Sequence, residues 1–299
     1  MKASIIISVR NDARIDACLA SIFNGGLDGV PKCEVEVIVV ENSAVPVLEA
    51  TIRKYPVLYA IEPRVGMGWA RLRALSLANG DFVVFTDADC VVSTGWLTRL
   101  LAPFQDPQVG IVGGPIVKFR PRGYAERLQR GLVVGDQKTV QYLAPLYGRP
   151  YVVTANAAFR GSALRSAGGI DPAFSSCGDV DMAWRIGDAG FAATIAPEAV
   201  VSHCARPTVW RVFWQFSTYS KGHARLFAKY RGGRRLCWNS YLVTRYLTGW
   251  REILNGLLHH SDARSRRAAI GAGAFGVVES LGLMHGAVVG SLKERVIYF

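Results

Sequence analysis

The chain has 299 residues, is 50% hydrophobic and carries a formal net charge of +12 at pH 7. This length accommodates one large α/β domain and an accessory region. None of the six cysteines forms a C-x-x-C pair, which argues against a zinc knuckle and a disulfide framework and favours a reducing cytoplasm. We expect no signal peptide, because the short apolar run at residues 4–9 has the character of a strand.

Strands and helices alternate through the first part of the chain. Apolar, β-branched runs predict buried strands, and apolar residues at helical spacing predict the helices between them. Asn11 or Asp12 is expected to cap the first helix, and Gly25-Gly26 to end it. This alternation predicts a doubly wound, mostly parallel sheet. The expected strands are 4–9, 35–40, 57–61 and 81–86, and the expected helices are 12–23, 47–54 and 69–78.

The regular alternation of strands and helices ends after residue 115. Residues 115–150 have mixed periodicity and several basic residues, and we interpret them as an insertion that borders the site. Pro197 breaks the apolar segment 192–203, whose second part is again a strand. The remaining predictions are a strand at 151–159 and short helices at 162–167 and 179–187.

Most of the excess positive charge lies in residues 205–267, which hold 13 Lys and Arg but only Glu252 and Asp262 as acids. This segment also contains four of the seven tryptophans. Basic residues mixed with Trp and Tyr suit an anionic membrane surface. A nucleic-acid contact and a solubilising basic face are the alternatives. We therefore divide the chain into an α/β domain, 1–204, and a basic, mainly helical region, 205–299.

The C-terminal region contains two expected helical segments. Residues 207–230 have aromatic faces, and residues 268–292 are apolar over a length that spans a bilayer. Glu279 is costly in a membrane. Gly282, Gly286 and Gly290 fall four apart and allow another helix to approach closely. Membrane entry, packing on the domain and an oligomer interface all remain open.

Asp87-Ala88-Asp89 closes the fourth expected strand. Open α/β sheets bind ligands at the carboxyl ends of their strands. Two carboxylates one residue apart can reach one hard cation, and phosphate oxygens or water complete its coordination. An isolated pair of this kind is commonly a solvated turn, so its meaning depends on the motifs around it.

Other polar groups follow the strands in a set order. Together they resemble the family 2 glycosyltransferases, which have a GT-A fold, over roughly residues 3–205. The resemblance rests on Ser8-Val9-Arg10-Asn11, Glu41-Asn42-Ser43, Asp87-Ala88-Asp89, residues 155–160, residues 168–174, Gly178-Asp179-Val180-Asp181 with Arg185, and Val201-Ser202-His203.

The resemblance implies transfer of a sugar from a nucleotide-diphosphate sugar with inversion at the anomeric carbon. Mg²⁺ or Mn²⁺ held by Asp89, with Asp87 bound directly or through water, would stabilise the charge that develops on the leaving diphosphate. His203 corresponds to a metal or phosphate ligand, with a structural histidine as the alternative.

The resemblance also implies nucleotide contacts. It places Asp87 near the donor ribose or sugar, and Arg71 at a basic position that can pair with a phosphate, although a solvated helix arginine is equally compatible. Glu41 corresponds to a nucleotide contact. The Glu-Asn-Ser sequence there, instead of an acidic pair, leaves the base open. The backbone from Ser8 to Arg10 is expected to line the same pocket.

Asp179 is the candidate general base, because an acceptor hydroxyl must lose its proton as the new bond forms. The alternative is a helix N-cap. The family motif carries Glu before this Asp, whereas this chain has Gly178, which leaves the acceptor contacts open. Asp181 is expected to pair with Arg185 across one helical turn.

Two other functions fit parts of the sequence. A nucleotidyltransferase acting on a sugar phosphate usually has a Gly-rich basic loop after its first strand, which residues 8–12 lack. A non-catalytic membrane or nucleic-acid binding module built on residues 205–267 leaves the order of the carboxylates unexplained.

The sugar, the base and the acceptor stay open, and the acceptor is a saccharide, a lipid-linked molecule or a small molecule. We expect a cytoplasmic protein that binds no nucleic acid. Peripheral contact with an anionic membrane and a homo-oligomer are further expectations.

Overall fold

The computed structural model describes residues 2–30, 34–119, 123–129, 137–143, 148–259 and 262–299. By their contacts, the residues fall into two compact units. The sheet unit contains the strands and helices up to Cys204, and the helical unit contains residues 205–299 together with α5 (Tyr124–Leu128).

A seven-stranded sheet forms the centre of the sheet unit, in the order β11-β6-β10-β4-β1-β2-β3. β1 pairs in parallel with both β2 and β4, and β3 continues in parallel beyond β2. Only β10 runs antiparallel to its neighbours, β4 and β6. The strands are β1 (Ala3–Val9), β2 (Val35–Glu41), β3 (Leu58–Ile61), β4 (Phe82–Asp87), β6 (Val109–Gly113), β10 (Asn156–Arg160) and β11 (Ala192–Ile195).

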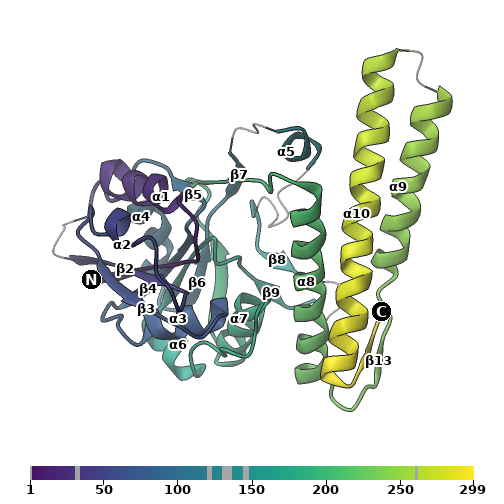
Figure 1. Cartoon of the computed structure of the whole chain (residues 1–299). Helices are drawn as coiled ribbons and strands as arrows, with labels where there is room; N and C mark the ends of the chain where they lie inside the picture. Colours follow the sequence, from purple (N-terminus) through teal and green to yellow (C-terminus); the bar gives the residue numbers. More distant parts are fainter. Residues whose placement is uncertain (1, 31–33, 120–122, 130–136, 144–147, 260–261) are drawn as a thin grey trace. The chain divides into compact units, whose positions relative to one another are not determined.

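Helices cover both faces of this sheet (Figure 1). On one face, Phe85 and Phe159 pack among small and aliphatic residues of α3, α6 and α7. The other face is covered by α1, α2 and α4. The predicted α/β fold with a mostly parallel, doubly wound sheet is therefore confirmed. The helices are α1 (Ile15–Ser21), α2 (Glu49–Ile52), α3 (Met67–Leu75), α4 (Trp96–Leu101), α6 (Gly161–Ser166) and α7 (Gly178–Asp188).

A second, three-stranded sheet has the order β5-β12-β7. β12 (Val201–His203) runs antiparallel to β5 (Cys90–Val92) and parallel to β7 (Ile116–Lys118). This pairing sets His203 opposite Cys90, one residue after Asp89. The short strands β8 (Gln141–Tyr142) and β9 (Pro150–Tyr151) form a separate antiparallel pair.

Several element bounds differ from the sequence prediction. The first helix begins at Ile15, because Asp12 accepts a hydrogen bond from the Arg14 backbone and forms a turn instead of a cap. The second shrinks to α2, since Glu41 accepts the N–H groups of Val47 and Leu48. The strand expected at 151–159 is divided between β9 and β10. Part of the segment 115–150 lies outside the described residues.

The helical unit is built from three long helices, α8 (Val209–Tyr230), α9 (Ser240–His259) and α10 (Ala263–Glu294). α10 packs against both α8 and α9. A Cβ added at Gly282 would lie 2.5 Å from the carbonyl oxygen of Phe213 in α8, so glycine permits this close approach. A short parallel pair, β13 (Leu236–Cys237) and β14 (Ile297–Tyr298), joins the start of α9 to the C-terminal residues.

α10 is the one described helix whose length and composition would allow it to cross a membrane, and 50% of its most apolar window is buried inside the protein. Glu279 in this helix pairs with Arg245 of α9 at 2.7 Å. Burial raises the pKa of Glu279, and the Arg245 guanidinium opposes that shift. The apolar segment 268–292 therefore forms the middle of a helix layer in this structure.

Candidate active site

The strand order reverses at β1, which places the site. The chain runs from β1 to β2 and β3 on one side and then returns to β4 on the other side. Open α/β sheets bind ligands at the carboxyl ends of strands at such a reversal. Ser8 of β1 and Asp87 of β4 lie opposite each other there.

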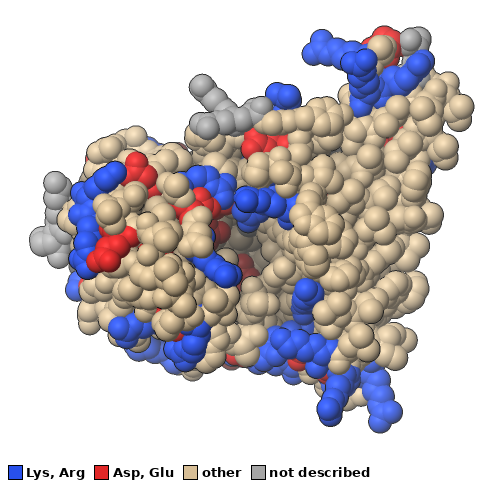
Figure 2. All heavy atoms as spheres, in the orientation of Figure 1, with Lys and Arg blue, Asp and Glu red and all other residues tan. Residues whose placement is uncertain are grey.

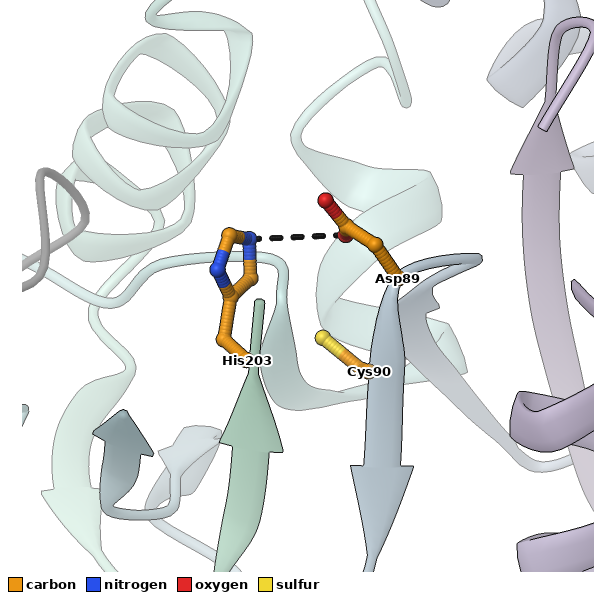
Figure 3. A group of neighbouring side chains, drawn as sticks. All are labelled: Asp89, Cys90 and His203. Atoms are coloured by element: carbon orange, nitrogen blue, oxygen red, sulfur yellow. Dashed lines mark ion pairs between the residues drawn. The ribbon is translucent and has the colours of Figure 1, made fainter. Parts of the chain in front are cut away.

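Asp89 and His203 meet at this edge (Figure 3). Asp89 follows β4, His203 ends β12, and the Asp89 Oδ1 atom lies 3.4 Å from His203 Nε2. Both side chains are buried, at 8% and 5% exposure. Together with the Cys90 sulfur, they offer ligand atoms that all lie within 4.8 Å of one another. Two of the predicted metal ligands, Asp89 and His203, therefore lie side by side, and their role in binding a metal stays a prediction.

The chemistry of this group fits a divalent cation with hard ligands. A carboxylate oxygen and an imidazole nitrogen suit Mg²⁺ or Mn²⁺, and their 3.4 Å separation is near the ~3 Å expected of neighbouring ligands around an octahedral ion with bonds of about 2.1 Å. The Nδ1 atom of His203 is buried and has no hydrogen-bond partner among the described residues. Burial raises the pKa of the Cys90 thiol, so Cys90 is not expected to act as a ligand.

Arg14, which the sequence analysis did not select, neutralises part of this site. One guanidinium nitrogen lies 3.3 Å from Asp89 Oδ2 and 2.6 Å from Asp12 Oδ2. Asp12 holds the guanidinium through two of its nitrogens. Nothing in the local sequence connects Arg14 with Asp89, because the two meet only once β1 has paired with β4.

Arg71 on α3 forms an ion pair with Asp87, with 3.3 Å between the Arg71 nitrogen and Asp87 Oδ1. The Arg71 side chain is 13% exposed, and its guanidinium lies over the Phe85 ring. A solvated helix arginine does not describe this position. Asp87 keeps 28% of its side chain exposed, so one side of it remains open to a ligand.

Asp179 stands in the first turn of α7, next to Arg71. The helix begins at Gly178, and the residue before it, Cys177, has a left-handed backbone with φ of 60°. Asp179 is therefore inside the helix and is not its N-cap, although its Oδ1 accepts the Val180 N–H at 3.0 Å. Burial raises the pKa of Asp179, and the Arg71 charge and backbone N–H groups oppose the shift.

Asp181 and Arg185 pair across one turn of α7, at 2.9 Å, as the sequence predicts. Asp181 is fully buried, and Arg185 also donates to the backbone oxygens of Ala167 and Gly169. Through these contacts, Arg185 links α7 to the end of α6. It thereby fixes the turn that carries Asp179.

Glu41 and Asn42 shape two loops at the carboxyl end of β2. Glu41 is fully buried, and its carboxylate accepts from the backbone of Val47 and Leu48 and from the Tyr59 hydroxyl. Asn42 donates to the backbone oxygens of residues 62 and 64 and accepts from the N–H of residue 66. A nucleotide contact through the Glu41 carboxylate therefore remains a prediction, while its observed partners are all within the protein.

Ser8 and Arg10 lie at the end of β1 and just after it. The Ser8 hydroxyl is buried and has no hydrogen-bond partner among the described residues. The Arg10 side chain is exposed. Both positions are compatible with the predicted nucleotide pocket.

A protein-family model for "Glycosyl transferase family 2" matches residues 4–168. The matched segment is more than half of the chain and contains β1 to β4 and the Asp87-Ala88-Asp89 motif. The chain therefore belongs to glycosyltransferase family 2.

Two curated relatives illustrate the reach of this similarity. The chain is 35% identical over 142 residues to a pre-mycofactocin glycosyltransferase of Mycobacterium tuberculosis, over 46% of this chain and 30% of that relative. It is 27% identical over 213 residues to the glycosyltransferase AglE of Haloferax volcanii, over 68% of this chain and 67% of that relative. The chain thus spans under a third of the mycobacterial relative that it matches.

Solved structures share the GT-A fold. A Pyrobaculum calidifontis mannosyltransferase in complex with GDP-Man and Mn²⁺ aligns with a TM-score of 0.59 at 20% identity, over 95% of this chain and 87% of that chain. The structure of GalNAc-T7 with UDP, GalNAc and Mn²⁺ aligns with a TM-score of 0.56 at 17% identity, over 90% and 53%. At these identities the likeness establishes the fold.

Proposed function

We propose that this protein is a metal-dependent inverting glycosyltransferase that moves a sugar from a nucleotide-diphosphate sugar to an acceptor hydroxyl. The observation that carries the proposal is the meeting of Asp89 and His203, 3.4 Å apart and buried, at the strand-order reversal. A solvated acidic turn would place neither residue inside the protein.

Asp89 and His203 would hold the cation, with Asp87 next to it directly or through water. When bound, Mg²⁺ or Mn²⁺ supplies Lewis-acid stabilisation of the diphosphate leaving group. Two structural neighbours with bound Mn²⁺, the mannosyltransferase and GalNAc-T7, support this choice of ion. Arg14 lies 3.3 Å from the Asp89 oxygen that does not face His203, so it offsets part of the negative charge of the site before a ligand arrives.

Arg71 and Ser8 would position the donor. Arg71 presents a partly buried guanidinium that can exchange the Asp87 carboxylate for a phosphate oxygen, with paired hydrogen bonds of a kind that lysine does not make. The Ser8 hydroxyl has an unused hydrogen bond at the same edge. A buried polar atom of this kind gains most when a ligand supplies its partner.

Asp179 would act as the general base. The acceptor oxygen forms a bond to the anomeric carbon while the bond from that carbon to the diphosphate oxygen breaks, and the hydroxyl proton moves to the Asp179 carboxylate. Attack opposite the leaving group inverts the anomeric configuration. The raised pKa of Asp179 makes its carboxylate a stronger base than an ordinary surface aspartate.

The metal and donor assignment is tested by calorimetric titration of UDP, GDP, dTDP and CDP with and without Mn²⁺. We expect one nucleotide to bind at least tenfold more tightly with the metal, and Asp89→Asn to abolish that gain. Asp81→Asn, at the opposite end of β4, is the matched control and should keep it. Equal binding by the wild type with and without Mn²⁺ would disprove the assignment.

The stereochemistry is tested separately, once a donor and an acceptor are known. The NMR coupling constant of the anomeric proton should show a product linkage opposite to that of the donor. A retained configuration would require another mechanism and would remove the role given to Asp179.

A further inference from the structure

The α9–α10 hairpin carries an apolar surface toward solvent. In α9, Leu247, Trp250, Leu254 and Leu258 have exposures of 58%, 45%, 53% and 74%. These residues recur every three or four positions and form one stripe along the helix. The residues of α9 that face α10 are different, namely Leu242, Gly249 and Gly256, and they are buried. The exposed stripe is therefore not part of the packing between the helices.

α10 adds a second stripe. Its exposed apolar residues include Leu281 at 44%, Val288 at 49% and Leu292 at 76%. At about 100° per residue, the α9 stripe lies about 145° past the contact between the two helices and the α10 stripe about 80° past it, each measured in the direction of the chain. Because the helices run in opposite directions, these rotations bring both stripes to the same side of the hairpin. We call this side the apolar hairpin face.

Aromatic residues of α8 border this face. His285 lies on the same side of α10 as Leu281 and Val288, and its ring is 5.4 Å from the Trp214 ring. Trp210 contacts Trp214 edge to face, and the two tryptophans are 65% and 42% exposed. Tryptophan with one solvated edge is characteristic of the interface between water and lipid.

Positive charge stands at both ends of the apolar hairpin face. Arg264, Arg266 and Arg267 are exposed in the first turn of α10. Arg234 and Arg235 are exposed at the other end, before β13. Figure 2 shows Lys and Arg gathered at these two ends of the hairpin, with a largely uncharged surface between them. α9 has 20 residues, so the two basic groups stand about 30 Å apart.

Acidic residues are kept away from this face. Residues 205–299 contain four acids, Glu252, Asp262, Glu279 and Glu294. Glu279 and Glu294 form ion pairs with Arg245 and Arg225, and Asp262 caps α10. The helical periodicity places Glu252 on the opposite side of α9 from the leucines. Arg251 is exposed within the α9 stripe, between Leu247 and Leu254. The surface is therefore apolar with one arginine in its middle and basic at its ends.

We propose that the apolar hairpin face binds an anionic phospholipid bilayer, with α9 and α10 lying in the plane of the interface. An apolar stripe with basic residues beside it is the pattern of a helix that enters the headgroup region. A second copy of the chain is a poorer occupant. Packing two such faces together, parallel or antiparallel, sets arginines against arginines with no acid between them.

The same geometry argues against a spanning α10. Two of its sides are occupied by α8 and α9, and its middle holds the Arg245–Glu279 pair. Lipid then meets only the remaining side. This inference is independent of the sugar-transfer proposal, because none of its residues belongs to the site at β1 and β4.

The test is co-sedimentation of the full chain with vesicles of phosphatidylcholine alone or with 30% phosphatidylglycerol, at low and high salt. We expect binding to the anionic vesicles that weakens with salt. The double variant Leu254→Glu, Leu258→Glu should lose at least tenfold in affinity. The matched control Thr248→Glu, Asn255→Glu changes exposed residues on the polar side of the same helix and should stay within about threefold of wild type.

The contribution of charge is measured with Arg264→Gln, Arg266→Gln and Arg267→Gln. Each basic residue near an anionic surface contributes about fivefold to binding. Circular dichroism and nucleotide binding report whether each variant is folded. Three outcomes would overturn the proposal: no binding to anionic vesicles at low salt, equal losses in the leucine pair and its control, or a leucine variant that converts a dimer to a monomer without changing vesicle binding.

Discussion

The two units of this protein place their charges in opposite ways. In the sheet unit, charged side chains from separate elements converge on one edge and neutralise each other there, as in Arg14 with Asp89 and Arg71 with Asp87. In the helical unit, ion pairs connect neighbouring helices, and exposed positive charge lies at the helix ends.

This difference shows how packing and ligand binding make separate demands on a chain. Burying a charge is costly unless a partner is present. The sheet unit buries charged groups where several strands end together. The Ser8 hydroxyl and His203 Nδ1 are also buried there without a hydrogen-bond partner among the described residues. The helical unit buries mainly glycine and apolar contacts, and its largely buried Glu279 is paired with Arg245. Changes in one unit should therefore act on chemistry, and changes in the other on stability.

The largest effect is expected at Asp179. Asp179→Asn removes the proposed base but keeps the side-chain volume, so transfer should fall by roughly 10²–10⁴-fold while donor affinity is unchanged. Asp188→Asn on the same helix is the control, because Asp188 is 61% exposed and pairs only at the surface with Arg149. Steady-state kinetics check this. Turnover of Asp179→Asn within a fewfold of wild type would leave Asp179 a structural role only.

A close helix contact should give the next effect. Gly286→Leu would push a side chain into the backbone of Ser217 in α8, and overpacking of this kind costs up to about 3 kcal/mol. Calorimetry should show a lower melting temperature for the helical unit, with metal-dependent nucleotide binding retained. In contrast, an added Cβ at Gly187 in α7 meets no atom within 4 Å. Gly187→Ala should therefore raise the free energy of unfolding by about 0.5–1 kcal/mol. Equal effects of both changes would contradict this reading of α10.

Acid should weaken the helical unit through His223. Burial lowers the pKa of His223 from 6.5 to about 4, so between these values the unfolded chain binds the proton and the folded chain does not. The free energy of unfolding therefore has its full value above pH 6.5 and decreases as the pH falls toward 4. The decrease is about 2 kcal/mol at pH 5. Urea unfolding at pH 8 and pH 5 measures this. His223→Gln should flatten the dependence, and an unchanged slope in that variant would assign it to another group.

The smallest effect is expected at Arg71. Arg71→Gln removes the guanidinium beside Asp87 and should raise the donor KM by about tenfold, or about 1.4 kcal/mol. Arg73→Gln is the control, because Arg73 is exposed on the same helix. If both substitutions had the same effect, the contribution of Arg71 would be general electrostatics and would not depend on its place in the site.

The local pattern of the sequence was enough to predict β1, β2, β3 and β4. β1, β2 and β4 are largely apolar runs in the middle of the sheet, whereas β3 is a short run at its edge. Asp87 and Asp89 follow β4 at the predicted edge, whereas His203 comes from the second sheet, at a position that only the resemblance to the family indicated. The segments that held β5, α4, β6 and α9 were not assigned. α9 was missed because its leucines point outward, so their periodicity does not by itself identify a core.

The amino-acid sequence alone determined which residues carry charge, where the strands end, and that residues 205–267 are basic and rich in tryptophan. Only the tertiary structure decided which charges neutralise each other, that Glu41 is turned inward to hold its own loop, and that the leucines of α9 and α10 share one side. The physical reason is that backbone propensity and hydrophobic periodicity act over neighbouring residues, whereas ion pairing and burial depend on elements that are distant in the chain and meet only after folding.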